Sequence, residues 1–326
     1  MPLSGKANLA FVPKSAGSGP QIALFIDRFE WHAREMLRAF NRLGVRCVPM
    51  RLSACSFDTR RPSGLVIPGF GPHLPDLVLV RAIGLGSFES ITLRLGLLHA
   101  LMEQGIPLTN SARAIERCVD KAATSFLLHK ESIPTPPTFA LQSPRATRAL
   151  VRRECLNGPL VLKPLFGAQG RGLKLIRHES DLPEIDAMAG VYYLQRFVGH
   201  QQIGHEQNGY SDIRVLVSQG RVVAAMTRRA EHWITNIKLG ARPEPLVLDM
   251  EMKDLALKAA AVVGADFAGV DLLRAADGEL LVIEVNSMPG WQGLQSVTDF
   301  SIAEVLAGDL LTRHGFAPVM PAEMAS

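Results

Sequence analysis

The stretch from Phe267 to Asn286 reads FAGVDLLRAADGELLVIEVN, two apolar runs with Asp277-Gly278 between them. An Asp-Gly pair in this setting is the strongest short-range signal for a β-hairpin. If these two residues alone form the loop, counting outward along both strands places Asp271 directly opposite Glu284. Residues that face each other across an antiparallel pair lie on the same side of the sheet. The sequence therefore predicts two neighbouring carboxylates on one face of the hairpin.

The other face of this hairpin is apolar. The residues that alternate with the carboxylates are expected to point into a core: Val270, Leu272, Ile283 and Val285. Asn286 lies two residues beyond Glu284 and shares the face of the carboxylates.

Two facing carboxylates destabilise an antiparallel pair by a few tenths to about 1 kcal/mol unless a partner offsets their repulsion. Mg²⁺ is a suitable partner, because it prefers oxygen ligands and is usually held by one or two carboxylates together with substrate phosphates. The hairpin therefore predicts a magnesium site at Asp271 and Glu284. Two alternatives stay open: a bulge that changes the register, or arginine partners for both carboxylates.

A second candidate site is the segment 163–172, which carries Gly167, Gly170 and Gly172 between two apolar runs. Glycines allow backbone N–H groups to approach phosphate oxygens closely. The segment lacks the Gly-Lys-Ser/Thr order of a Walker A loop, and its lysine, Lys163, ends a strand instead. We expect phosphate binding here, with a glycine-rich hairpin without a ligand as the alternative.

Two further segments can contribute to the same site. Lys121 follows Asp120, which can cap the start of a helix, and an exposed helix lysine is the alternative to a phosphate contact. The segment Gln195-Arg196-Phe197-Val198 follows an apolar strand and can offer backbone groups to an adenine edge, although an ordinary strand end fits equally well.

In the first third of the chain, short apolar runs alternate with helical spacing: 22–26, 31–43, 45–50, 65–67, 77–80, 91–103 and 106–109. This order predicts a small open parallel sheet covered by helices. The later part combines helical segments with paired strands around turn residues: 120–131, 145–154, 160–176, 212–227 and 267–285. It predicts α+β structure with antiparallel sheets.

Composition narrows the class of protein. The chain has 326 residues, 47% of them hydrophobic, which is enough for a sizeable core and about two domains. The four cysteines form no CxxC motif, and no apolar run is long enough to span a membrane, so we expect a cytoplasmic protein without a membrane partner. The net charge of +4 comes without a basic run, which leaves a nucleic-acid-binding module as the weakest hypothesis.

The order and spacing of these segments resemble the ATP-grasp superfamily, and within it the RimK-like carboxylate–amine ligases that add glutamate. The resemblance runs from about residue 110 to residue 310. It rests on an ordered set of motifs: Asp120-Lys121, 163–172, 194–198, 212–215, 225–228, Asn236, 268–271 and 283–286.

The resemblance implies a role for each matching residue. ATP would be contacted by Lys121, Lys163, Gly167, Gln169, Gly170, Gly172, Gln195, Phe197 and Val198. One or two Mg²⁺ ions, with Mn²⁺ as an alternative, would be held by Asp271, Glu284 and Asn286. Arg228 would stabilise the transferring phosphate, while Arg214 and Asn236 would lie close to phosphate or to the substrate carboxylate.

The implied fold is mixed α/β and α+β. An N-terminal parallel open-sheet domain, the pre-ATP-grasp domain, is expected at 21–109. A two-lobed ATP-grasp unit with antiparallel sheets is expected to follow, with a small lobe at 110–190 and a C-terminal lobe at 191–315. Residues 1–20 and 316–326 are expected to be tails.

The implied reaction is ATP-dependent amide formation through an acyl phosphate, with L-glutamate as the amine. The sequence Pro164-Leu165-Phe166-Gly167 favours a branch that glutamylates pterin cofactors such as tetrahydromethanopterin. Phe166 and Ala168 depart from the acidic and hydroxyl residues of the branch that modifies ribosomal proteins. The alternatives are glutamylation of a protein or peptide C-terminus and a phosphotransferase that uses the same ATP site. We expect no nucleic-acid partner and leave a homo-oligomer open.

Overall fold

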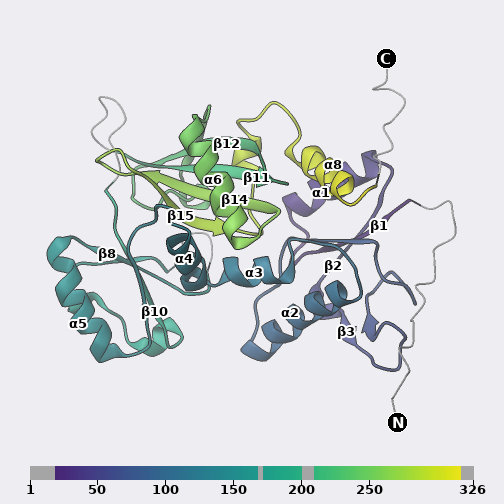
Figure 1. Ribbon diagram of the computed structural model, residues 1–326, viewed down its shortest axis with the longest axis horizontal. Coiled ribbons are helices and arrows are strands. Elements are labelled where there is room, and N and C mark those ends of the chain that lie inside the picture. The colour runs from purple at the N-terminus through teal and green to yellow at the C-terminus, as the bar shows by residue number, and fades with distance from the viewer. Residues whose placement is uncertain (1–18, 168–171, 200–208, 317–326) are drawn as a thin grey trace, which may run out of the picture. The chain divides into compact units, whose positions relative to one another are not determined.

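The computed structural model describes residues 19–167, 172–199 and 209–316 (Figure 1). The chain forms two compact units. One comprises the residues up to Leu108 together with those from Leu311 onward, and the other comprises Thr109–Leu310. Every residue that the sequence suggested for ATP or metal belongs to the second unit.

The first unit contains the predicted parallel sheet. Its strand order is β2-β1-β5-β6, and β1 pairs in parallel with both β2 and β5. The strands are β1 (Gln21–Phe25), β2 (Arg46–Met50), β5 (Leu77–Val80) and β6 (Leu108–Thr109). The helices α1 (Trp31–Arg42) and α2 (Phe88–Glu103) cover opposite faces of this sheet (Figure 1).

The apolar run at 65–67 does not form the parallel strand that the sequence predicts. Leu65 begins β4 (Leu65–Val66), which pairs antiparallel with β3 (Ser56–Phe57) in a separate two-stranded sheet. The sequence had suggested a buried parallel strand at 65–67. Periodicity does not decide the direction of pairing for so short an apolar run, and here a short loop between β4 and β3 allows antiparallel pairing.

The second unit contains a small antiparallel sheet of order β7-β10-β8-β9. Its strands are β7 (Thr138–Leu141), β8 (Leu160–Lys163), β9 (Lys174–Ile176) and β10 (Tyr192–Arg196). Helix α5 (Pro144–Glu154) buries Leu150 and Val151 against this sheet. Because β10 belongs to it, the small sheet extends past residue 190, where the sequence had suggested a division between lobes.

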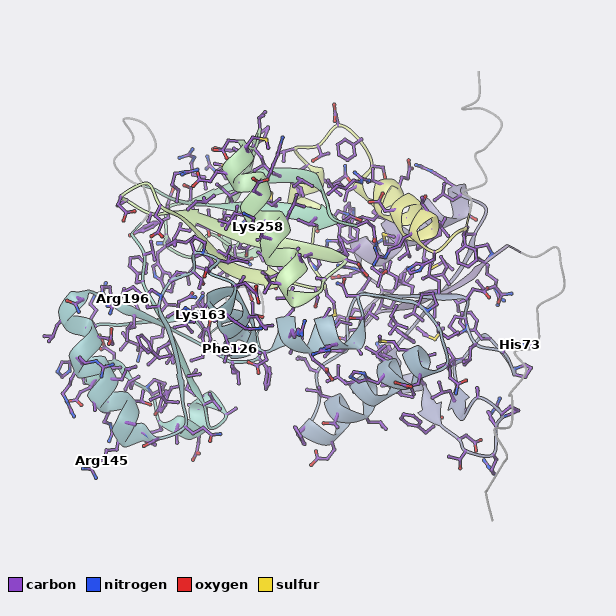
Figure 2. All side chains as sticks on the ribbon, viewed as in Figure 1. His73, Phe126, Arg145, Lys163, Arg196 and Lys258 are labelled. Atoms are coloured by element: carbon purple, nitrogen blue, oxygen red, sulfur yellow. The ribbon has the colours of Figure 1, made fainter. Side chains whose placement is uncertain are left out.

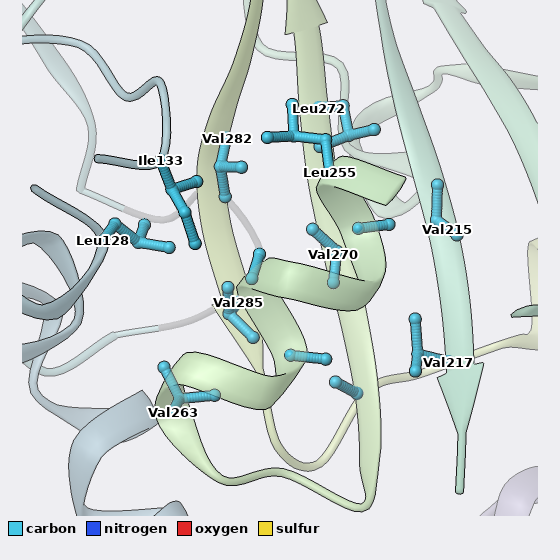
Figure 3. Close-up of a cluster of buried hydrophobic side chains, with 14 of the residues drawn as sticks. Leu128, Ile133, Val215, Val217, Leu255, Val263, Val270, Leu272, Val282 and Val285 are labelled. Atoms are coloured by element: carbon cyan, nitrogen blue, oxygen red, sulfur yellow. The ribbon is translucent and has the colours of Figure 1, made fainter. Parts of the chain in front are cut away.

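The large sheet of the second unit is also antiparallel, with order β13-β12-β11-β14-β15. Its strands are β11 (Tyr210–Ser218), β12 (Arg221–Ala230), β13 (Arg242–Pro245), β14 (Phe267–Arg274) and β15 (Leu280–Asn286). Helix α6 (Met250–Val263) lies across one face of it (Figure 3). Val215, Val270 and Val285 meet α6 residues such as Ala259 and Val263 in the core.

The β14–β15 hairpin has a longer loop than the sequence suggested. Arg274 pairs with Leu280, and Ala275 N donates to Glu279 O, so the loop holds residues 276–278 rather than two residues. A bulge between Asp271 and Leu272 then shifts the register back by one residue. The two changes cancel, and Asp271 faces Glu284 as predicted.

The bulge changes which residue of β15 points into the core: it is Val282 rather than the expected Ile283. Leu272 pairs with Val282, and Asp271 with Glu284, so Ile283 is the extra residue on β15. Val282 is fully buried in the core with Val270, whereas Ile283 is only half-buried.

The remaining helices of the described chain are α3 (Ala112–Val119), α4 (Lys121–Lys130), α7 (Gln292–Gln295) and α8 (Ile302–Arg313). Short 3₁₀ turns lie at Leu52–Ala54, Cys155–Asn157, Glu179–Asp181, Ile185–Met188 and Ile237–Leu239. None of the helices in the described ranges combines the length and the apolar character needed to cross a membrane.

Candidate active site

A row of charged side chains crosses the large sheet on the face away from α6. Strand pairing places Arg228 of β12 opposite Asp212 of β11, Arg214 of β11 opposite Asp271 of β14, and Asp271 opposite Glu284 of β15. Side chains alternate along each strand, so the apolar residues between these charges face the α6 core. The sheet therefore separates a hydrophobic face from a charged one, and the charged face brings together most of the predicted metal and phosphate residues.

Asp271 lies at the centre of the row and is buried. Arg214 donates to both of its oxygens, from Nε to Oδ1 and from Nη2 to Oδ2 at 2.9 Å. Arg228 Nη2 lies 3.1 Å from Oδ2. Burial alone would raise the pKa of Asp271, but the two arginines bring it below its ordinary value, so the carboxylate is ionised. Arginine partners, the alternative left open from the sequence, are thus present for one of the two carboxylates.

Arg228 is held by a second carboxylate that carried no predicted role. Its Nε donates to Asp212 Oδ1 at 2.6 Å, and its Nη2 donates to Asp212 Oδ2. Burial opposes the charge of Arg228, but Asp271 and Asp212 more than offset this and raise its pKa. Arg228 is therefore a permanently charged group that two carboxylates hold in one orientation.

Gly269 provides the space in which Arg214 lies. A Cβ at this position would approach Pro289 Cβ to 2.7 Å and Arg214 Nη1 to 3.0 Å. Gly269 is two residues before Asp271 on the same face of β14, and it pairs with Asn286. The guanidinium group of Arg214 thus lies close to the Gly269 backbone while it binds Asp271.

Lys121 opens α4, as the sequence predicted. Asp120 caps this helix by accepting from Ala122 N at 2.9 Å and Ala123 N at 3.1 Å. Lys121 Nζ donates to Gly167 O at 2.6 Å and lies 3.8 Å from Glu284 Oε1. The lysine therefore connects the glycine-rich segment to the carboxylate row.

Lys163, which is labelled in Figure 2, lies at the end of β8 and is buried. Its Nζ donates to Gln195 Oε1 at 2.6 Å. Burial lowers the pKa of Lys163 to about 8, and the positive charge of Lys121 acts in the same direction, whereas Glu284 and Asp271 raise it. Two predicted ATP-binding residues, Lys163 and Gln195, are thus in direct contact with each other.

The glycine-rich segment is described at its two ends. Gly172 has a φ of +74°, and a Cβ there would come within 2.9 Å of Pro164 Cγ. Gly167 also lies against Pro164, with a 3.3 Å approach to its Cβ. A side chain at Gly172 would therefore be strained, and one at Gly167 would fit only if Pro164 shifted by a few tenths of an ångström. Gln169 and Gly170 lie outside the described residues.

Phe197 and Val198 follow β10 and line an open cavity of about 440 Å³. The opposite wall consists of the Pro134–Pro137 segment and the β14–β15 loop. Phe197 also makes an edge-on contact with Trp233, at 6.0 Å between ring centroids. The structure thus places these two predicted residues along the connection that leaves the small sheet.

The two predicted asparagines have different surroundings. Asn236 caps a 3₁₀ turn, because its Oδ1 accepts from Lys238 N at 2.9 Å. Asn286 is half-buried on the charged face of β15. Within the described part of the chain no hydrogen bond engages its side-chain amide, so its oxygen is available to a ligand. The side chain of Asn236 is therefore engaged in a local hydrogen bond, whereas the side chain of Asn286 is available to a ligand.

The donor set fits a hard divalent cation that arrives with phosphate. Among the described residues, no group of three His, Cys, Asp or Glu side chains is placed so that it could hold a metal ion. Glu284 is 30% exposed, the Asn286 oxygen is available, and one lone pair of Asp271 Oδ1 is free of arginine. Magnesium is usually held in this way, by one or two carboxylates with phosphates completing its shell.

Comparisons with known proteins agree with this arrangement. Residues 118–310 match the RimK-like ATP-grasp domain. The chain is 36% identical to the tetrahydromethanopterin:alpha-L-glutamate ligase of Methanococcus maripaludis over 216 residues, which are 64% of this chain and 71% of that protein. It is 26% identical to the enzyme of the same name from Methanosarcina acetivorans over 318 residues, which are 86% of this chain and 95% of that protein.

Solved structures share the fold. The ATP-grasp ligase PsnB, in a complex with a minimal precursor, Mg and ADP, superimposes with a TM-score of 0.67 at 20% identity, covering 90% of this chain and 98% of PsnB. The charged row, the two lysines and the glycine-rich segment all lie within the part of the chain that matches the RimK-like ATP-grasp domain. The chain belongs to the RimK-like ATP-grasp family and is a ligase that forms carbon–nitrogen bonds.

Proposed function

We propose that this ligase attaches L-glutamate, through its amino group, to a small-molecule carboxylate of the tetrahydromethanopterin type. The observation that carries the proposal is the row Arg228–Asp212–Arg214–Asp271–Glu284 on one face of the large sheet. It combines cations for phosphate and carboxylate groups with oxygen ligands for a metal. The names of the two methanogen relatives supply the substrate class.

The reaction would proceed in two steps. An oxygen of the substrate carboxylate attacks the γ-phosphorus of ATP, and the bond to the β,γ-bridging oxygen breaks, which gives an acyl phosphate and ADP. The amino group of glutamate then attacks the acyl carbon, inorganic phosphate leaves, and the amine loses a proton. The product is an amide.

The residues of this chain would share the stabilisation of charge. Lys121 and Lys163 would bind ATP phosphates, together with the loop ends Gly167 and Gly172. Arg228, which two carboxylates hold in place, would face the transferring phosphoryl group. Preorganised cations of this kind lower the barrier because they need no reorientation as charge moves.

Other positions complete the proposed site. The adenine side would consist of Gln195, Phe197 and Val198, with Gln169 and Gly170 in the loop. Mg²⁺, or Mn²⁺ with the same oxygen preference, would be held by Asp271, Glu284 and Asn286. When bound, it supplies charge neutralisation and alignment of the phosphate oxygens. Arg214 and Asn236 would lie near the phosphate or the substrate carboxylate.

The proposed compartment is the cytoplasm, because all four cysteines are free thiols and such cysteines are typical of reducing compartments. A homo-oligomer is left open, and neither a nucleic acid nor a membrane is among the proposed partners.

The test is a screen for ADP release. Purified protein is given ATP, Mg²⁺ and L-glutamate with pterin, peptide or amino-acid carboxylates. The proposal expects release only when a pterin-type carboxylate and the amine are both present. ADP release with the C-terminal carboxylate of a peptide instead would show that the substrate is a peptide or protein. A stable phosphorylated product formed without amine would indicate a phosphotransferase.

A double variant tests the proposed metal ligands. Asp271→Asn combined with Glu284→Gln removes both negative ligands while nearly preserving side-chain volume. Turnover should fall by at least about a hundredfold, since one electrostatic contact at a reacting centre is typically worth that much. Unchanged turnover in this variant would exclude the assignment.

A further inference from the structure

Lys163 is joined to a chain of uncharged hydrogen-bonding groups. Its Nζ donates to Gln195 Oε1 at 2.6 Å, and the described residues offer Nζ this one hydrogen bond. The two side chains are 9% and 2% exposed. A lysine ammonium carries three donors, so two N–H groups remain for a ligand.

Thr138 fixes the orientation of the Gln195 amide. Thr138 faces Gln195 across the β7–β10 pair, and Gln195 Nε2 donates to Thr138 Oγ1 at 3.2 Å. Thr138 Oγ1 donates its own proton to Pro136 O at 2.9 Å. Because that proton is used, Thr138 can only accept from Gln195, and because an ammonium only donates, Gln195 Oε1 must face Lys163. The three hydrogen bonds that link Lys163, Gln195, Thr138 and Pro136 therefore each have one assigned direction.

A second hydrogen bond of β10 reaches the helix that carries Lys121. Tyr193 lies two residues before Gln195 on β10, and its hydroxyl is 2.8 Å from Ser125 Oγ. Ser125 belongs to α4, one turn after Lys121. Strand β10 thus places one polar side chain against Lys163 and another against the helix that begins at Lys121.

We propose that Gln195 and Thr138 are positioning residues for nucleotide binding, which hold Lys163 Nζ at the phosphate site through an acceptor that leaves its charge unneutralised. The inference rests on the proposed assignment of Lys163 to ATP phosphates. A carboxylate at position 195 would form an ion pair with Lys163 and compete with phosphate. An apolar side chain there would leave the ammonium without its acceptor, at a cost typical of a lost hydrogen bond to a charged group.

The electrostatic surroundings support a neutral partner. Burial lowers the pKa of Lys163 to about 8, Lys121 lowers it further, and Glu284 and Asp271 raise it. Two carboxylates already attract the ammonium group of Lys163. A third carboxylate in direct contact would form an ion pair with it and leave less of its positive charge for phosphate. Gln195 supplies the geometry of an acceptor without that charge.

The test compares dissociation constants for ADP with Mg²⁺, measured by calorimetry on the full chain. Gln195→Met and Gln195→Glu should each weaken binding by at least about tenfold, and Thr138→Val by about threefold, from the range for hydrogen bonds to charged and neutral groups. The matched control is Thr147→Val. Thr147 is a buried threonine of α5 whose hydroxyl donates to Ser143 O at 2.9 Å, away from this chain.

A double-mutant cycle separates positioning from general destabilisation. In a Lys163→Met background, Gln195→Met should weaken ADP binding much less than it does in the wild-type background, because only its proposed adenine contact is left to lose, whereas a structural defect would weaken binding equally in both backgrounds. Additive effects, or Gln195 variants that bind like Thr147→Val, would overturn the inference. If Lys163→Met itself binds ADP normally, the proposed role of Lys163 fails instead, so the two failures are distinguishable.

Discussion

Asp271 shares its carboxylate between two guanidinium groups, which limits what it can offer to a metal ion. Three N–H groups from Arg214 and Arg228 already approach its oxygens. When Asp271 itself is included, the site holds four cations and three carboxylates. The cations are Lys121, Lys163, Arg214 and Arg228, and the carboxylates are Asp212, Asp271 and Glu284. This balance disfavours a lone divalent cation and favours a cation that carries phosphate.

We therefore expect the metal to bind together with nucleotide. A titration with Mn²⁺ followed by electron paramagnetic resonance should show saturable binding in the presence of ADP and little binding without it. Arg214→Met removes one cation and should strengthen binding without nucleotide. Tight binding of Mn²⁺ by the wild-type protein alone would contradict this order.

The lowered pKa of Lys163 predicts that the affinity for nucleotide depends on pH. Its pKa is lowered to about 8, so the ammonium loses its proton as the pH rises through that value. A neutral amine does not attract phosphate as a cation does, so the affinity for ADP should fall above about pH 8. Binding titrations across this range measure the fall. Lys163→Arg keeps its charge and should flatten the profile, and an equal slope in both proteins would refute the assignment.

Single residues also mark the limit of sequence reasoning. Lys121 and Lys163 could be found because a helix cap and a strand end are local signals. Asp212 could not be found in this way. Counting back from the Gln219-Gly220 turn pairs it with Thr227, but a bulge between Leu216 and Val217 makes Arg228 its partner. A bulge depends on tertiary packing and leaves no clear local pattern.

At the scale of elements, alternation along β11, β14 and β15 allows one sheet to hold both core and site. Val215 and Val270 face α6, while Arg214 and Asp271 face the opposite side. Helix α6 itself was not predicted. Its sequence, MEMKDLALKAAAVV, is apolar on several sides and rich in alanine, which weakens the helical stripe. Ala256, Ala259 and Ala260 are buried because the helix lies close to the sheet.

Gly269 gives a prediction for this sheet. In Gly269→Ala the new Cβ would meet Pro289 at 2.7 Å and Arg214 at 3.0 Å, so Arg214 should leave Asp271. Overpacking of this kind typically costs about 1–3 kcal/mol of unfolding free energy. Turnover should fall by at least about tenfold, because a bidentate charge-assisted contact is lost. Urea unfolding and steady-state rates measure the two effects.

The matched control is Gly308→Ala in α8, where nothing lies within 4 Å of the added Cβ. It should be neutral or stabilising by up to about 1 kcal/mol, as is typical for alanine in a helix. If Gly269→Ala behaved like this control, the packing role of Gly269 would be wrong.

At the scale of the whole molecule, the sequence predicted the parallel sheet of the first unit and the antiparallel sheets of the second. Continuous apolar runs separated by helices, and hairpin turns between paired runs, distinguish the two kinds of sheet. It did not predict how β10 joins β7 and β8, because that pairing links segments far apart in the chain. The Gln195–Thr138 contact depends on this pairing and was missed for the same reason.

The central claim is that ATP activates a carboxylate for attack by an amine. The most direct measurement uses the carboxylate that passes the ADP-release screen, labelled with ¹⁸O in its carboxyl group, with ATP, Mg²⁺ and L-glutamate. An acyl phosphate requires one labelled oxygen to leave the substrate and appear in the inorganic phosphate. The account predicts that transfer, in proportion to the amide formed. Amide formation with unlabelled phosphate, or labelled phosphate retained in a stable product without amine, would contradict it.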